Sequence, residues 1–189
     1  MRYALALGLV LALGSSATAH IALMSPPPRT ADQKAGPCGV AGSTRGTTVT
    51  TYAPGETITV EWNETVGHPG HYRIAFDDDG NDAFVNPNMP DDNFAFTLVD
   101  QITDRDGETH YTQSVKLPTT PCANCTMQLV QVMTTAVPYN SFYFQCADIT
   151  LSGEPAPDGD IGGGCQTSSG SGLGALVLVG LLALRRRRR

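Results

Sequence analysis

The central part of the sequence has very few basic residues. Between His20 and Asp160 it contains six, against all eighteen acidic residues of the chain, which leaves a formal charge of −12. Proteins that bind nucleic acid through its phosphates carry clusters of Lys and Arg. We therefore expect no nucleic acid among the partners, and we expect a protein that works on neutral material.

The same region lacks a sustained 3.6-residue hydrophobic period and any internal repeat, so helices should be few and short. Apolar and polar residues alternate instead, and turn clusters rich in Pro, Gly and Asp separate the alternating segments. The expected strands are residues 56–64, 71–77, 94–98, 109–117, 125–134 and 141–153. Short alternating strands at this spacing predict an antiparallel β-sandwich formed by a single domain, residues 20–153.

The N-terminus has the three parts of a secretory signal peptide. Arg2 is followed by an apolar run over residues 3–14 and by a small-residue stretch that ends in Ala17-Thr18-Ala19. The run is shorter than the roughly 20 residues of a membrane-spanning helix. We expect cleavage after Ala19, which makes His20 the first residue of the exported protein; an uncleaved anchor is the alternative.

The C-terminus predicts a sorting tail. Residues 154–172 form a linker rich in Gly, Pro and Ser that contains Cys165, and an apolar run over 173–184 precedes five arginines, 185–189. The arginines favour a cytoplasmic C-terminus. This arrangement resembles the MYXO-CTERM tails of myxobacterial surface proteins, which implies a processing protease that acts near Cys165 and a product associated with the cell surface or outer membrane. A plain membrane anchor is the alternative.

Four cysteines lie in the central region, which in an exported protein indicates two disulfides. The sequence alone allows three pairings. A local bond between Cys122 and Cys125 would leave Cys38 with Cys146. Zinc is the competing interpretation of the C-x-x-C pair, but a second ligand pair with the usual spacing is lacking.

An N-terminal histidine is an unusual metal ligand. His20 would offer its α-amine, whose pKa is near 8, and its imidazole from one residue. With a second imidazole these groups form a near-planar set of three nitrogens, which favours copper. A histidine that follows the cleavage site by chance is the alternative.

The second imidazole has three candidates. His68 and His71 flank Pro69-Gly70 just before an expected strand, where a ligand can be held rigidly. His110 lies in a polar stretch, and we expect it at the surface.

From His20 to about Gly153 the sequence resembles the lytic polysaccharide monooxygenases, copper enzymes with a histidine brace. The resemblance is carried by several short segments in the family's order: His20-Ile21-Ala22-Leu23, Ser25-Pro26-Pro27-Pro28-Arg29, Gly36-Pro37-Cys38-Gly39, Glu61-Trp62, His68-Pro69-Gly70 and Tyr143-Phe144-Gln145-Cys146-Ala147-Asp148-Ile149. It implies an immunoglobulin-like sandwich. It also pairs Cys146 with Cys38, which leaves Cys122 with Cys125.

The resemblance implies a site as well as a fold. His20 matches the first copper ligand and His68 the second, with His71 as the fallback, and Tyr143 matches the aromatic residue on the axial side of the metal. The family uses copper, an external reductant and oxygen or peroxide to abstract a hydrogen beside a glycosidic bond. The expected substrate is a polysaccharide such as chitin or cellulose.

One position departs from the family's pattern. Ser141 stands where fungal members have a Gln that helps to position oxygen, and Gln145 lies on the same expected strand at a different offset. Three functions therefore stay open: oxidative cleavage of a polysaccharide, copper capture or delivery without that reaction, and a structural or adhesive role in which His20 is incidental.

Two further features have weaker interpretations. The acidic residues 77–82 surround a glycine turn, as in calcium loops, but the downstream Glu of an EF-hand is lacking, so we favour a solvated turn. Tyr139 and Phe84 are candidates for a flat sugar-binding face.

Overall fold

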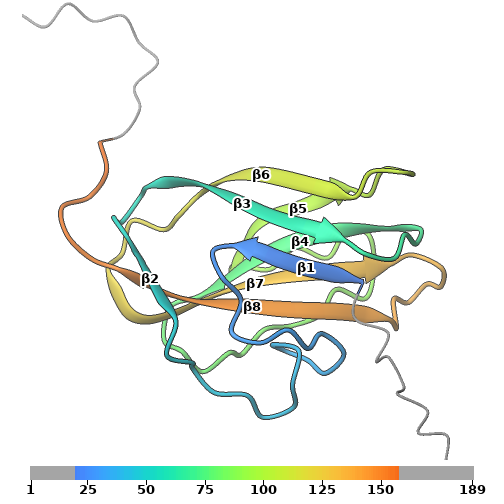
Figure 1. Cartoon of the computed structure of the whole chain (residues 1–189), viewed down its shortest axis with the longest axis horizontal. Helices are drawn as coiled ribbons and strands as arrows, with labels where there is room; N and C mark the ends of the chain where they lie inside the picture. The colour runs from blue at the N-terminus through green and yellow to red at the C-terminus, as the bar shows by residue number, and fades with distance from the viewer. Residues whose placement is uncertain (1–19, 158–189) are drawn as a thin grey trace, which may run out of the picture. The chain divides into compact units, whose positions relative to one another are not determined.

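The computed structural model describes residues 20–157 (Figure 1). The predicted signal peptide, residues 1–19, and the tail with Cys165 lie outside the described residues. Contacts divide the chain into residues 1–158 and 159–189. The described residues belong to the first unit.

The described residues form eight strands in two sheets and contain no helix. The strands are β1 (Ile21–Ser25), β2 (Val49–Tyr52), β3 (Thr57–Glu64), β4 (Gly70–Asp77), β5 (Thr97–Thr103), β6 (His110–Lys116), β7 (Cys122–Met133) and β8 (Phe142–Leu151). One sheet has the order β1-β3-β6 and the other β2-β8-β7-β4-β5 (Figure 1). The expected all-β sandwich is confirmed, and this part of the chain has no apolar helix long enough to cross a membrane.

The hydrophobic core lies between the two sheets, because alternate residues of each strand point inward. Trp62 of β3 is fully buried; its ring stacks on Tyr111 of β6, with centroids 5.4 Å apart, and meets the edge of Tyr72 of β4 at 5.1 Å. Ile74 and Leu129 extend the same core. Each such side chain contributes about 1.5–3 kcal/mol through burial.

The structure corrects three details of the predicted strands. Phe94 and Phe96 precede β5 instead of forming a strand, and their rings stack at 5.4 Å in the connection. The strands β1 and β2 were missed because they are only five and four residues long. The β2–β8 pair is parallel, so the sandwich is not antiparallel throughout.

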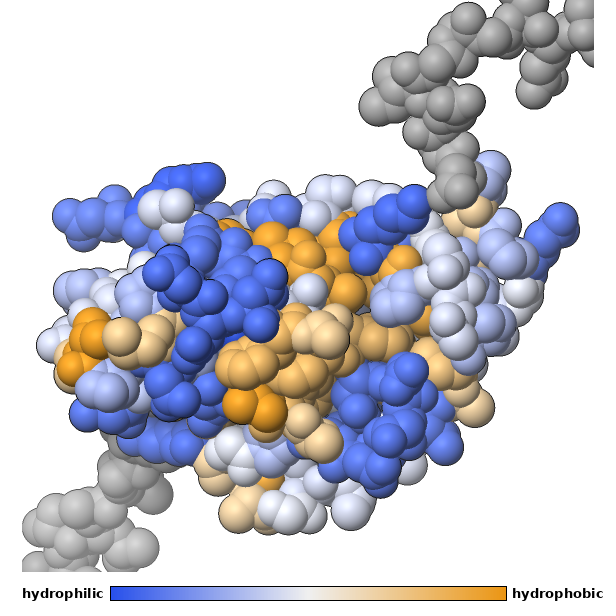
Figure 2. Space-filling model, turned by 180° about the vertical axis from the view of Figure 1, so that it is seen from behind, coloured by the Kyte–Doolittle hydropathy of each residue, from blue (hydrophilic) through white to orange (hydrophobic). Residues whose placement is uncertain are grey.

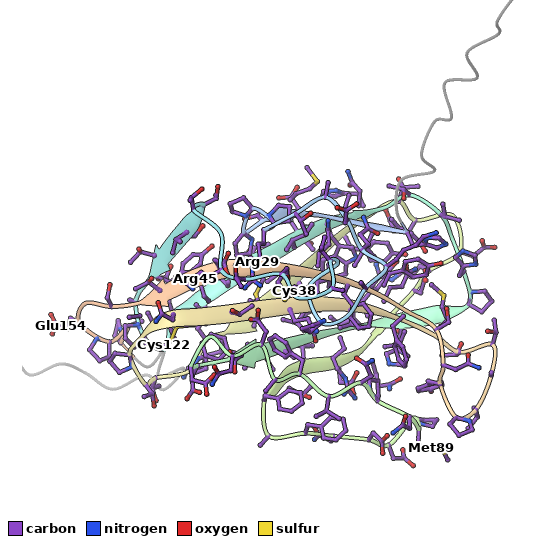
Figure 3. The ribbon with its side chains drawn as sticks, turned by 90° about the horizontal axis from the view of Figure 1, so that it is seen from below. Arg29, Cys38, Arg45, Met89, Cys122 and Glu154 are labelled. Carbon is purple, nitrogen blue, oxygen red and sulfur yellow. A yellow bond between two sulfur atoms is a disulfide. The ribbon has the colours of Figure 1, made fainter. Side chains whose placement is uncertain are left out.

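Both expected disulfides are present. Cys38–Cys146 joins the long connection after β1 to the middle of β8, across 108 positions of sequence, and Cys122–Cys125 closes a short loop at the start of β7 (Figure 3). Cys122 and Cys125 are therefore bonded to each other, which excludes them as zinc ligands in this state.

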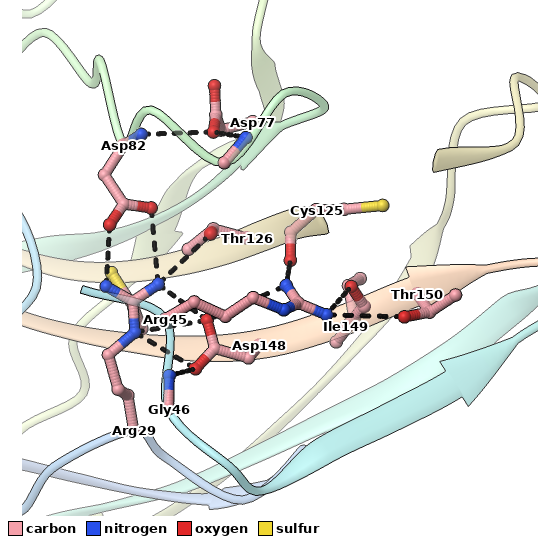
Figure 4. A network of polar contacts seen from close by, with 12 residues as sticks. Arg29, Arg45, Gly46, Asp77, Asp82, Cys125, Thr126, Asp148, Ile149 and Thr150 are labelled. Atoms are coloured by element: carbon pink, nitrogen blue, oxygen red, sulfur yellow. Dashed lines mark hydrogen bonds and ion pairs between the residues drawn. The ribbon is translucent and has the colours of Figure 1, made fainter. Parts of the chain in front are cut away.

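The acidic segment 77–82 is anchored to the domain by Arg29 (Figure 4). The Arg29 guanidinium lies 2.6 Å from Asp82 and 2.6 Å from Asp148, whose side chain is fully buried. The Asp77 carboxylate accepts hydrogen bonds from the backbone nitrogens of Gly80 and Asp82. The expectation of a solvated turn is wrong for Asp82, because its carboxylate forms a buried ion pair with Arg29.

Apolar side chains also reach the surface. Figure 2 shows an apolar area near the centre of the face hidden in Figure 1, with polar surface around it. A cavity of about 310 Å³ is lined mainly by Phe76, Ala95, Phe96 and Leu98. Tyr139 is buried, so it does not form the expected sugar-binding face, and Phe84 packs edge-on against Phe96.

Candidate metal centre

Three aromatic rings from distant parts of the sequence meet at one end of the sandwich. His20 immediately precedes β1, His68 lies in the β3–β4 connection, and Tyr143 is the second residue of β8. The His20 ring stacks on Tyr143 with centroids 3.6 Å apart and planes 14° from parallel, and it stacks on His68 at 4.6 Å and 15°. The structure thus brings together the three residues that the sequence predicted for a copper site.

The backbone holds the two histidine-bearing segments next to each other. Ile21 of β1 pairs with Glu64, the last residue of β3, and the backbone nitrogen of Thr65 donates to the His20 carbonyl at 3.2 Å. His68 follows three residues later, so the same antiparallel ladder positions both imidazoles.

Both imidazoles have a nitrogen available for a ligand. His20 Nδ1 and His68 Nε2 are buried and make no hydrogen bond. Burial, followed by repulsion from His68 and Lys34, lowers the pKa of His20, which keeps its ring neutral and its lone pair free. A buried nitrogen without a partner costs about 1–3 kcal/mol, a cost that a bound metal ion removes. The nitrogen donors fit copper.

Comparison with known proteins agrees with copper as the metal of this site. Residues 18–170 match the family described as copper acquisition factor BIM1-like, which covers the whole described part of the chain. The chain belongs to this family. Copper is therefore the metal of the BIM1-like domain, and the predicted cofactor is confirmed.

Three solved structures are similar to the BIM1-like domain at low identity. They are a lytic polysaccharide monooxygenase AA15 from Thermobia domestica in the Cu(I) state (19% identity, 62% of this chain, 76% of that chain, TM-score 0.40), a polysaccharide monooxygenase CBM33 (20%, 60%, 70%, 0.42) and an AA10 lytic polysaccharide monooxygenase from Streptomyces lividans (16%, 60%, 62%, 0.31). No curated protein matches the sequence.

The remaining histidines of the BIM1-like domain have partners elsewhere. His71 is buried on the other face of β4 from the core residue Tyr72, with its Nε2 3.2 Å from the Gln101 side-chain nitrogen and 3.6 Å from Asp100. The contacts of His71 therefore lie away from His20, and His68 is the better second ligand. His110 is exposed, as expected.

Gln145 does not replace the missing oxygen-positioning Gln. Its Oε1 accepts a hydrogen bond from the Leu23 backbone nitrogen, and its Nε2 donates to the Thr30 carbonyl at 3.0 Å. Gln33 binds both backbone groups of Ile21. The two glutamines hold β1 in place and so position His20, a role that the sequence did not reveal for Gln33.

Gln131 is a second residue that the sequence analysis missed. It lies directly opposite Tyr143 in the β7–β8 ladder and is fully buried. Its side-chain nitrogen donates to Glu64 at 2.9 Å and to Asp104 at 3.4 Å, while its Oε1 has no partner. The only signal in the sequence is a polar residue at an inward-facing position of β7, two residues after Leu129.

An acidic cavity of about 260 Å³ adjoins His68. It is lined by Glu64, by the loop 67–69, and by Asp104, Arg105 and Asp106 of the β5–β6 connection. Burial, followed by repulsion from Asp104, raises the pKa of Glu64. The raised pKa favours the protonated form of Glu64.

Proposed function

We propose that this protein is exported and captures copper at a histidine brace formed by His20 and His68. The observation that carries the proposal is the pair of unpartnered nitrogens, His20 Nδ1 and His68 Nε2, on two rings whose centroids lie 4.6 Å apart. Membership of the BIM1-like copper acquisition family supports it independently.

The third nitrogen of the brace is the α-amine of His20, which becomes free if export cleaves the chain after Ala19. An α-amine has a pKa near 8, so a useful fraction is unprotonated at neutral pH. The hydrogen bonds of Gln33 and Gln145 to β1 fix the backbone next to this amine. Copper bound there would supply one-electron redox chemistry.

Two features favour capture or delivery as the main role. Ser141 occupies the position at which an oxygen-directing Gln is expected. The side-chain oxygen and nitrogen of Gln145 both form hydrogen bonds with backbone groups, so Gln145 does not take over that role. The central region carries a formal charge of −12, which raises the local concentration of cations near the domain.

Oxidative cleavage of a polysaccharide is the second candidate function. It is favoured by Tyr143, whose ring lies 3.6 Å from that of His20 and so shields one side of the proposed metal position. In this case a neutral polymer such as chitin or cellulose would be the substrate and an external compound the reductant.

The location of the protein is part of the proposal. The signal peptide directs export, and the tail retains the protein at the cell surface or outer membrane until a protease processes it near Cys165. A copper-capturing domain held there would meet copper that is present outside the cell.

One experiment separates the two functions. The exported protein is titrated with Cu(II), and then supplied with reductant and peroxide on insoluble chitin and cellulose while soluble products are analysed by mass spectrometry. Tight copper binding without oxidised oligosaccharides supports capture; oxidised products that disappear in a His20→Ala variant support the monooxygenase. A wild-type protein that fails to bind copper contradicts both.

A further inference from the structure

We propose that the end of the sandwich around His20 and His68 is a docking surface for a second protein, one that accepts the copper and has a basic rim around an apolar contact area. The inference rests on the proposed capture function and adds the kind of partner that receives the metal. Figure 1 shows that β1 starts at the same end of the domain as the β3–β4, β5–β6 and β7–β8 connections. An acceptor therefore has to approach the histidines over these connections.

Backbone hydrogen bonds join the connections at this end to one another. The backbone nitrogen of Thr134, in the β7–β8 connection, donates to the Pro69 carbonyl of the β3–β4 connection at 3.0 Å. In the same β7–β8 connection, the backbone nitrogen of Tyr139 donates to the Asn88 carbonyl of the β4–β5 connection at 2.8 Å. These bonds fix the positions of the three connections relative to each other, so their exposed side chains form one surface.

Each of the three joined connections carries an exposed large apolar side chain. Val66 is 41% exposed, Met89 46% and Val137 59%. Figure 3 shows Met89 at one end of the domain and Glu154 at the other. A single exposed apolar residue is ordinary, but three on bonded connections beside a metal centre resemble the apolar part of an interface.

Exposed carboxylates at the same end indicate the charge of the partner. A backbone hydrogen bond of 3.0 Å ties the β5–β6 connection to the end of β3. Asp106 and Glu108 of this connection are exposed, and residues 104–109 contain three acidic residues against one basic residue, Arg105. Asp91, two residues after Met89, is also exposed. Charges across an interface are complementary and speed the encounter, so the partner should carry Lys or Arg around its contact area.

These features fit a basic protein better than the two other occupants of such a surface. A neutral polysaccharide has no charges for the carboxylates, and Tyr139, the expected sugar-binding aromatic residue, is buried. A second copy of the domain would bring the same formal charge of −12 and would be repelled. A small, charge-steered interface is typical of transient complexes, which suits the transfer of a metal ion.

The test uses two synthetic acceptor peptides as probes. Both have the same three histidines and the same apolar residues, and they are flanked by either Lys or Glu. Stopped-flow spectroscopy follows copper transfer from the loaded, exported protein at increasing peptide concentration. We expect the rate to rise with the concentration of the Lys peptide, to be at least about tenfold higher than with the Glu peptide at low salt, and to lose this advantage as salt is added.

Two double variants test the surface itself. Asp91→Asn/Glu108→Gln should slow transfer to the Lys peptide by at least about threefold and leave transfer to the Glu peptide unslowed, because it removes the attraction alone. Val66→Ser/Val137→Ser should slow transfer to both peptides, because both present apolar residues. Copper affinity should stay within about threefold of the wild type in both variants, since neither pair includes a proposed ligand.

Matched controls lie away from this end of the domain. Asp78→Asn/Glu154→Gln removes two exposed charges, and Val49→Ser replaces an exposed valine of β2. Both should transfer copper as the wild type does. Equal slowing in test and control variants, or a rate that does not depend on peptide concentration, would overturn the proposal.

Two further measurements separate the remaining outcomes. If Val66→Ser/Val137→Ser loses binding to insoluble chitin or cellulose and keeps normal copper transfer, the surface serves a polysaccharide and the proposal is wrong. Binding of the Lys peptide to the metal-free protein is measured by fluorescence anisotropy. A failure of the histidines to bind copper would therefore contradict the proposed function and leave this readout of docking intact.

Discussion

The ring of His20 lies face to face with the ring of Tyr143, with centroids 3.6 Å apart and planes 14° from parallel. This stacking orients the His20 imidazole before any metal is bound, so the ligand loses little side-chain freedom on binding. Stacked aromatic pairs of this kind contribute about 0.5–1.5 kcal/mol beyond the area they bury.

Two substitutions of Tyr143 should separate the effect of its stacked ring on copper affinity from the effect of its hydroxyl group. Tyr143→Phe keeps the stacked ring, so copper affinity should change less than about threefold, whereas Tyr143→Ala should weaken it by about tenfold, the equivalent of the lost stacking energy. Competitive titration against a chelator of known affinity measures both. Equal weakening in the two variants would show that the hydroxyl, rather than the ring, matters.

Removal of the second ligand should affect copper far more than removal of a surface histidine. His68→Ala should weaken binding by more than the roughly 10–100-fold that the loss of a supporting residue costs. His110→Ala is the matched control, because His110 is exposed and interacts with Asn63 and Glu61. If His71→Ala abolishes binding while His68→Ala does not, the assignment of the second ligand is wrong.

The two disulfides should contribute very differently to stability. Cys38–Cys146 spans 108 positions and Cys122–Cys125 only three, so their effects on the entropy of the unfolded chain differ. Replacing Cys38 and Cys146 together by Ala should cost about 2–5 kcal/mol of unfolding free energy. Replacing Cys122 and Cys125 should cost clearly less. Urea denaturation of both variants measures the difference, and equal losses would contradict this explanation.

Glu64 should make the domain less stable as the pH rises. Burial and Asp104 raise its pKa in the folded state, so the folded protein holds a proton that the unfolded chain loses at lower pH. The stability from this proton is present below the unfolded pKa of about 4.3 and is lost as the pH rises through the folded value. Glu64→Gln should therefore remove this loss, and thermal melting of metal-free protein at pH 5 and pH 8 tests it. A pH dependence that is unchanged in the variant would contradict it.

The fold was predictable where one strand face is buried and the other exposed. The alternation in β3 and β6 reflects burial of Ile58, Val60 and Tyr111 against the opposite sheet. The same signal misled at Phe94 and Phe96, because aromatic residues that alternate can also stack in a connection. Strand pairing, including the parallel β2–β8 pair, depends on contacts between distant segments and left no local pattern.

The proposed metal ligands could be predicted from the sequence, whereas the residues that hold them in place could not. His20, His68 and Tyr143 are recognisable because their chemical types are specific and their order follows a known family. Gln33 and Gln131 carry no such mark, since a glutamine is usually exposed, whether it lies in a connection as Gln33 does or on a strand as Gln131 does. Their roles arise only when the fold brings them to Ile21 and Glu64.

The strand β1 lies at the edge of its sheet, paired with β3 alone within that sheet. Edge strands are the first to fray, and here the fraying segment begins next to one of the proposed ligands. A metal ion joined to both His20 and His68 would close the open end of the β1–β3 ladder, and loss of the ion would release it. Slowed hydrogen exchange at Ala22, which pairs with Asn63 in this ladder, would then report copper occupancy from the backbone alone. The N-terminal strand of this domain would thus act as a latch that is closed when copper is bound.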